Sequence, residues 1–245
     1  MGIFGYITSS IGLALEVWLS VLLVRRKAHR NFPMFFLYVV FEIWESISGL
    51  SVYSNLVIYY FVFWANNVIV LIISTLALLE VFRWVFVLFW LRWWFRGALY
   101  GAMAGALALA IYDDILYPPV SMETFGGLIF TCGIAVYFVQ LTIFALFCLL
   151  SKHLQIRFRR YAFGIMLGFA IIALGALVPR VFWREFKMNF FMRVYTPAIM
   201  YLLGLIFWLH VFLQRERPIP EWSLSLTPDQ LADQIKQQAK IFKRL

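Results

Sequence analysis

Residues 32–49 read FPMFFLYVVFEIWESISG and form an apolar run long enough to cross much of a lipid bilayer. Near the middle of this run, Glu42 and Glu45 lie three residues apart, so one turn of a helix places them on the same face. Ionisable side chains at that depth are costly, and they usually have a partner or a task in the protein interior. The stretch therefore predicts a membrane-spanning helix that carries acids with a structural or functional role.

The composition of the whole chain agrees with this stretch. Of its 245 residues, 64% are hydrophobic and 13% are charged, and the mean hydropathy is +0.86. Soluble domains average about 45–50% apolar and about 25% charged residues. We therefore expect an all-α, polytopic membrane protein in contact with the lipid bilayer, with one transmembrane domain over residues 1–214 and a cytoplasmic tail over residues 215–245.

The apolar runs predict seven transmembrane helices. Their expected ranges are 3–24, 33–53, a long helix that begins at 56, 97–112, 125–150, 161–178 and 194–213. For residues 56–96 we favour one helix that leaves the membrane near Glu80 and continues along its surface. An alternative frame, with the crossing at 64–91, places Glu80 and Arg83 inside the bilayer. Prolines Pro33, Pro179 and Pro197 are expected at helix ends, because proline interrupts helix interiors.

The distribution of Lys and Arg predicts the orientation. Seventeen of these residues fall in the segments that seven crossings place on the side of the C-terminus, and four fall on the other side. Because cytoplasmic loops carry the excess of Lys and Arg, we expect the N-terminus outside and the C-terminus inside a bacterial inner membrane or another plasma membrane. The net charge of +9 then reflects membrane topology and lipid headgroups, and we expect no nucleic-acid partner.

Acidic and amide side chains form the first candidate site. Glu16 lies in the first predicted helix at a depth comparable with that of Glu42, and no Lys or Arg lies at this depth. We expect a protonated acid, a bound cation, a file of water or a polar ligand there. The alternative is that protonated acids only hydrogen-bond between helices. The candidate ligand or ion pathway comprises Glu16, Glu42, Glu45, Asn66 and Asn67.

Glycines at intervals of four form the second candidate site. Such spacing leaves one helix face bare, so that another helix can approach closely. The sequence leaves open whether the contact is made within the chain or between chains. We expect the segment 97–112 to bind other membrane subunits or a second copy of the chain. The candidate packing or oligomer residues are Gly97, Gly101, Gly105, Gly164 and Gly168.

The sequence of the tail predicts an amphipathic helix over residues 227–244. Thr227 is suited to the N-cap position, and Pro228 follows it at the first helical position. Leu231, Ile235 and Phe242 share one face of this helix. We expect this face to lie on the inner membrane surface or to contact a partner on the inner side.

No motif for catalysis is evident, so we predict no catalytic residues and favour a protein that is not an enzyme. We also predict no metal ligands and no specific cofactor, although His153 and His210 leave a haem-bearing subunit as a third hypothesis. The favoured function is an accessory or structural subunit of a membrane complex, or a receptor-like sensor. The alternative is a small transporter or a proton- or cation-coupled channel that uses Glu16, Glu42 and Glu45.

Overall fold

A computed structural model describes residues 3–52, 56–116, 125–153, 160–186 and 190–214. The chain divides into two units, Met1–Gln214 and Arg215–Leu245. The second unit, with the predicted helix 227–244 and its residues Leu231, Ile235 and Phe242, lies outside the described residues. Every regular element in the described ranges is a helix: α1 (Ile3–Arg25), α2 (Ala28–Asn31), α3 (Pro33–Val52), α4 (Leu56–Val85), α5 (Val87–Trp90), α6 (Trp93–Leu116), α7 (Phe125–His153), α8 (Arg160–Phe186) and α9 (Phe190–Leu213).

Six helices in the described part of the chain are long and apolar enough to cross a membrane. The candidate spans are Thr8–Arg25, Tyr60–Val85, Trp93–Tyr112, Thr131–His153, Arg160–Pro179 and Tyr195–Leu213. The predicted all-helical fold is therefore confirmed for the described residues, and the six candidate spans are consistent with a multi-pass membrane protein. The predicted second crossing, α3, is not among these six, and the count of seven stays a prediction.

The continuous helix predicted beyond residue 56 is wrong, because α4 ends at Val85 and the chain turns back through α5 into α6. Phe86, at the turn, is fully buried. Its ring centroid lies 5.6 Å from that of Phe95 and 5.8 Å from that of Phe147. Burying this aromatic side chain between α6 and α7 favours a tight reversal over a helix that continues along the membrane surface.

Two prolines also depart from the prediction. Pro179 lies inside α8 and Pro197 inside α9, whereas both were expected at helix ends. Neighbouring helices and local backbone adjustment make interior prolines tolerable in membrane helices. Gly175 lies four residues before Pro179, at the position that a proline ring crowds in a helix. Because Gly175 has no side chain, Met200 of α9 packs closely against it. Pro33 is the first residue of α3, as predicted.

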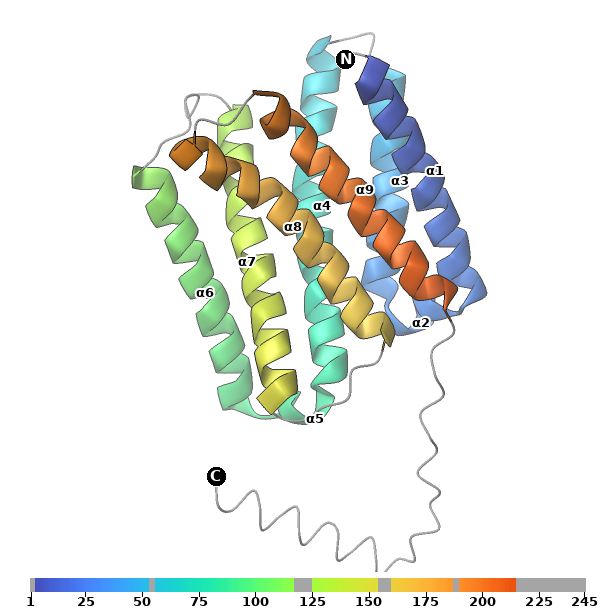
Figure 1. The fold of residues 1–245 in the computed structure, drawn as a ribbon. Coiled ribbons are helices and arrows are strands. Elements are labelled where there is room, and N and C mark those ends of the chain that lie inside the picture. The colour runs from blue at the N-terminus through green and yellow to red at the C-terminus, as the bar shows by residue number, and fades with distance from the viewer. Residues whose placement is uncertain (1–2, 53–55, 117–124, 154–159, 187–189, 215–245) are drawn as a thin grey trace, which may run out of the picture. The chain divides into compact units, whose positions relative to one another are not determined.

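Within the first unit the helices pack as a bundle (Figure 1). α1 packs on α3 and α9, α3 on α4, and α4 on α7 and α8; α8 packs on both α7 and α9, and α6 on α7. One end of this unit holds the last residues of α1, α4, α7 and α9 (Figure 1). The first residues of α3, α6 and α8 lie at the same end. We call it the basic end, because these residues lie at or beside its helix termini: Arg25, Arg26, Lys27, Arg30, Arg83, Arg92, Arg96, Lys152 and Arg160.

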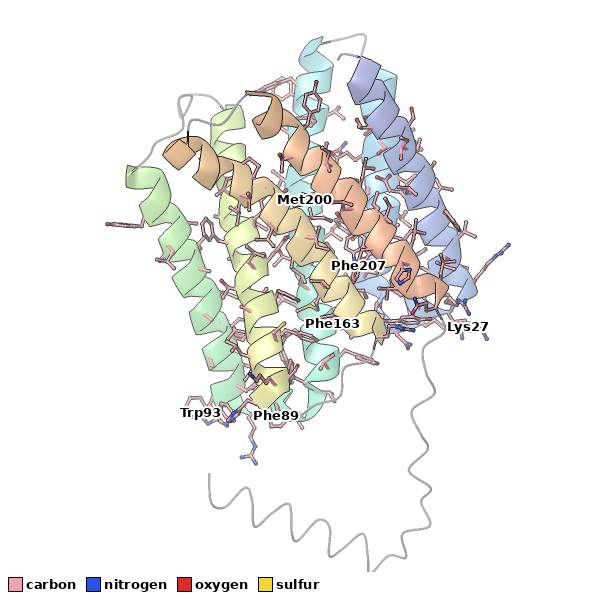
Figure 2. The ribbon with its side chains drawn as sticks, in the orientation of Figure 1. Lys27, Phe89, Trp93, Phe163, Met200 and Phe207 are labelled. Atoms are coloured by element: carbon pink, nitrogen blue, oxygen red, sulfur yellow. The ribbon has the colours of Figure 1, made fainter. Side chains whose placement is uncertain are left out.

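Side chains at the basic end bind the end of α9. Lys27 has a left-handed backbone (φ 56°) at the turn between α1 and α2, and Figure 2 shows it and Trp93 toward this end. Arg26 donates a hydrogen bond of 2.8 Å to the Leu213 carbonyl, and Tyr161 donates one of 3.1 Å to the Gln214 carbonyl. These donors satisfy carbonyl groups at the end of α9 that have no partner within the helix.

Glycines bring α8 and α9 into close contact. A side chain at Gly164 would meet Val211 at 2.5 Å, and one at Gly168 would overlap the indole ring of Trp208. Trp208 is fully buried, and its ring centroid lies 5.0 Å from those of Phe35 and Phe169. The core of the unit is therefore an aromatic cluster at the junction of α3, α8 and α9.

Candidate functional site

The side chain of Tyr201 brings the acids of α1 and α3 together. Its hydroxyl oxygen lies 2.7 Å from Oε1 of Glu16 and 3.1 Å from Oε2 of Glu42. Both distances are within hydrogen-bond range. α9 therefore connects two acidic side chains that come from two other helices, and we call Glu16, Glu42, Glu45, Ser46 and Tyr201 the acidic cluster.

A second contact joins α1 to α3 directly. The Ser46 hydroxyl donates to Oε2 of Glu16 over 3.3 Å, so each carboxyl oxygen of Glu16 has a hydroxyl neighbour. Glu16 is 2% exposed. Oε1 of Glu16 lies beside Gly12, 3.7 Å from where a Cβ atom of that residue would be, which is an ordinary contact distance. The polar faces of α1 and α3 thus meet at this point.

The acidic cluster lies near the middle of the bundle. Glu42 follows the start of α3 at Pro33 by nine residues, and Glu16 precedes the end of α1 at Arg25 by nine residues. At 1.5 Å of rise per residue, both are about 14 Å from the basic end. This is close to half of a hydrocarbon core of about 30 Å, where water is absent and unsatisfied polar groups are costly.

The hydrogen bonds around Tyr201 constrain where hydrogen atoms lie. A phenol has one hydrogen to donate, whereas its oxygen can also accept. Tyr201 contacts two carboxyl groups, and Tyr38 forms a further side-chain hydrogen bond with Glu42. When Tyr201 donates to Glu16, its shorter contact, a full hydrogen bond with Glu42 needs a hydrogen on the Glu42 carboxyl.

Aromatic residues close the cluster toward the basic end. The ring of Tyr38 lies one turn from Glu42 on α3, with its centroid 4.9 Å from that of Phe169 and 5.9 Å from that of Trp208. In the opposite direction along α3, polar residues continue through Glu45, Ser46 and Ser48. Polar side chains therefore extend from the cluster toward the end opposite the basic end.

The predicted amides occupy different places. The side chain of Asn66 donates to the Ser48 hydroxyl over 2.9 Å, and Ser48 donates to the Glu45 carbonyl over 3.0 Å, so α4 joins the polar residues of α3. Asn67, the next residue, is half-buried. Gln140 of α7 donates to Ser74 of α4 over 2.9 Å. This last pair fastens α4 to α7.

Tyr201 and Tyr38 are the residues of this site that the sequence analysis did not identify. Membrane proteins concentrate tyrosine at the two interfaces. Tyr201 instead lies 12 residues before the end of α9, which is about 18 Å of helix. A tyrosine so deep in an apolar helix needs a partner for its hydroxyl, and that was the available signal.

The described residues show no group of three or more His, Cys, Asp or Glu side chains that could hold a metal ion. The three acids of the cluster therefore do not converge as a set of metal ligands. Nε2 of His210, which entered the haem hypothesis, lies 2.8 Å from the amide nitrogen of Gln214, one turn away on the exposed end of α9. This histidine thus has a local partner.

The two sets of predicted glycines differ in their surroundings. Gly164 and Gly168 lie at the contact between α8 and α9. By contrast, a side chain added at Gly97, Gly101 or Gly105 would meet no atom within 4 Å. The glycines of α6 therefore face open space in the described part of the chain, and they leave a bare strip along the side of the bundle.

No protein-family model matches the sequence, and no curated protein or solved structure matches it.

Proposed function

We propose that this protein is a small membrane transporter or channel that is coupled to protons through the acidic cluster. The observation that carries the proposal is the hydroxyl of Tyr201 between the carboxyl groups of Glu16 and Glu42. Full hydrogen bonding of this group needs a hydrogen on a carboxyl in the middle of the bundle. Buried acids of this kind mark proton relays in membrane proteins.

Two further observations bear on what neutralises these acids: the lack of a basic partner calls for a proton or another cation, and the arrangement of the acids favours the proton. No Lys or Arg precedes Arg25 in α1, and α3 contains none, so these carboxyls lack a nearby basic partner on their own helices. The described acids also do not converge as metal ligands. A proton needs only the pairwise oxygen contacts that Tyr201 makes, whereas hard metal ions need several oxygen ligands at once.

The residues on either side of the acidic cluster suggest how protons reach and leave it. Tyr38 and Trp208 each lie five residues from the basic end of their helix, nearer to that end than Glu16 and Glu42, and their rings pack with that of Phe169; we call these three rings the aromatic barrier. On the other side, Ser48 and Asn66 continue the polar contacts. In this proposal, protons reach Glu42 from the end opposite the basic end, and release past the aromatic barrier requires a rearrangement of α9 against α3.

Proton flux into proteoliposomes tests the proposal. The purified protein is reconstituted with a trapped pH-sensitive dye, and a potassium diffusion potential drives proton entry. We expect flux above that of empty liposomes, and we expect Glu42→Gln to abolish it, because the amide cannot exchange a proton. Asp113→Asn is the matched control, since Asp113 lies near the end of α6, a helix that contributes no residue to the cluster. Equal flux in wild type and Glu42→Gln would contradict the proposal.

The open glycine strip of α6 favours a second candidate function, that of an accessory subunit which docks on another membrane protein or on a second copy. Gly97, Gly101 and Gly105 have no neighbour within 4 Å, although such spacing is typical of close helix contact. In a background without native cysteines, Gly101→Cys should cross-link to a partner in native membranes. Leu107→Cys, exposed on another face of α6, should not. Equal cross-linking at both positions, or at neither, would contradict docking through the strip.

We also propose that α3 is a seventh crossing. α1 and α4 both end at the basic end, so the chain must return to the opposite end between Arg25 and Leu56 (Figure 1). α3 has 20 residues, which span about 30 Å and match the hydrocarbon core. Its exposed apolar face is suited to lipid and comprises Leu37, Val40, Trp44 and Ile47. Seven crossings with the basic end in the cytoplasm place the N-terminus outside.

A further inference from the structure

A cavity of about 950 Å³ lies at the basic end, away from the acidic cluster. Its walls come from α2, the start of α3, the end of α4, α5 and α6. Residues from five helices therefore form one depression where the candidate crossing Tyr60–Val85 ends. Its volume is in the range of cavities that hold small molecules.

Two arginines from separate parts of the chain line this cavity. Arg30 belongs to α2 and Arg83 to α4. Glu80 is the one acid among the described lining residues, and its carboxylate already has partners at the start of α3: its Oε2 accepts the backbone N–H groups of Met34 at 3.0 Å and Phe35 at 3.4 Å. The cavity therefore has an excess of positive charge, and its carboxylate is directed toward the N-terminus of α3.

The walls change from polar to apolar along α4. Arg83 and Trp84 lie near the end of this helix, whereas Leu76 lies seven residues earlier, about 10 Å deeper. Met34 and Leu76 are exposed apolar side chains on the walls. Trp90 and Tyr100 add aromatic rings of the kind that lie at headgroup level. A ligand that fits this gradient has an anionic head and an apolar body.

We propose that this cavity binds an anionic phospholipid of the surrounding membrane. Arg30 and Arg83 hold the phosphate through charge-assisted hydrogen bonds, and an acyl chain lies against Leu76 and Met34. The site is independent of the acidic cluster, and its binding requires no proton movement. The bound lipid connects the turn α4–α5–α6 to the start of α3.

Native mass spectrometry of the detergent-solubilised full chain tests this site. The protein is titrated with phosphatidylglycerol, with phosphatidylcholine and with inorganic phosphate. We expect one phosphatidylglycerol to be retained per chain in preference to phosphatidylcholine. The double variant R30Q/R83Q should weaken retention by at least about tenfold, as expected for the loss of charge-assisted hydrogen bonds.

The matched control is R25Q/R96Q, which removes the same charge at the same end from residues that do not line the cavity. Retention should be unchanged in this variant. Equal weakening in both double variants, or equal retention of the two lipids, would overturn the proposal. Displacement of the lipid by millimolar phosphate alone would show a site for a free anion, and would equally overturn it.

A second measurement applies when R30Q/R83Q does not fold. A phosphatidylglycerol with a photoreactive group in its acyl chain is added to wild-type protein, and the cross-linked peptides are identified. We expect cross-links at the start of α3 and in the segment 76–83 of α4. Cross-links spread evenly over the exposed apolar residues of the bundle would contradict a specific site.

Discussion

At the scale of single residues, the hydroxyl of Tyr201 has the greatest influence on the centre of the bundle. It lies within hydrogen-bond distance of two carboxyl groups from different helices. Removing it leaves Glu16 with the longer contact from Ser46, at 3.3 Å, and leaves Glu42 without its contact to α9. In an apolar interior, a polar group that loses its partner costs far more than the same loss at a surface.

We expect Tyr201→Phe to lower the free energy of unfolding by about 1–3 kcal/mol, because it leaves buried carboxyl oxygens without a partner. Thermal unfolding in detergent measures the change. Tyr100→Phe is the control, because Tyr100 is exposed on α6 and lies outside the cluster. A Tyr201→Phe variant as stable as this control would show that the two contacts do not hold α9 to α1 and α3.

The residue scale also shows what the sequence could reveal about the site. Glu16 and Glu42 were identified because acids in apolar runs stand out, and counting residues from the helix ends placed them at similar depth. Tyr201 was not identified, because its depth signals only that its hydroxyl needs a partner, and which residues it meets depends on the rotation of α9 about its axis. The periodicity of an almost uniformly apolar helix carries little information about that rotation.

At the scale of helices, Glu80 connects α4 to the start of α3. Its carboxylate accepts two backbone N–H groups that the first turn of α3 cannot satisfy itself, those of Met34 and Phe35. This is the role of an N-cap side chain, but it is performed by a residue more than forty positions away along the chain. The end of α4 and the start of α3 are thereby fixed to each other.

Glu80→Ala should destabilise the protein by about 0.5–2 kcal/mol, the usual effect of losing an N-cap side chain. Glu80→Gln should lose less, because its amide oxygen still accepts a hydrogen bond. Amide hydrogen exchange should rise at Met34 and Phe35 in the alanine variant. Unchanged exchange at these two positions would contradict the capping role.

Helix packing gives a second prediction at this scale. Gly168→Ala should cost about 1–3 kcal/mol, because its methyl group would overlap the indole of Trp208, which is fully buried. Gly101→Ala introduces the same methyl group into open space on α6 and should not destabilise the helix. Comparing the unfolding temperatures of the two variants isolates the packing effect. Similar losses would indicate an effect of backbone conformation instead.

The helices illustrate why some boundaries were predictable and others were not. α1 and α3 follow the predicted ranges closely, because charged residues or Pro33 mark their ends at the membrane surface. The turn between α4 and α6 was missed, since no Gly, Pro or run of polar residues precedes it. Burial of Phe86 determines it, and that depends on tertiary contacts with Phe95 and Phe147. At Pro179 the error was the opposite one: a helix end was predicted there, but α8 continues through this residue.

At the scale of the whole molecule, the number of crossings decides which loops face which side. Six spans have the length and composition to cross, and an even number would place both ends of the first unit on the same side. The direction of the helices argues for an odd number. α4 ends where α1 ends, at the basic end (Figure 1), so α3 must travel the length of the bundle between them.

Accessibility of introduced cysteines tests this parity. In right-side-out membrane vesicles from a background without native cysteines, a cysteine in place of Gly2 should react with a membrane-impermeant maleimide. A cysteine at Lys27 or Lys152, both at the basic end, should react only after the vesicles are permeabilised. The expectation rests on the concentration of Lys and Arg at that end, which the inside-positive bias assigns to the cytoplasm. Reaction of the cysteines at positions 2 and 27 from the same side would show that α1 does not cross the membrane, and the depth assigned to Glu16 would be wrong.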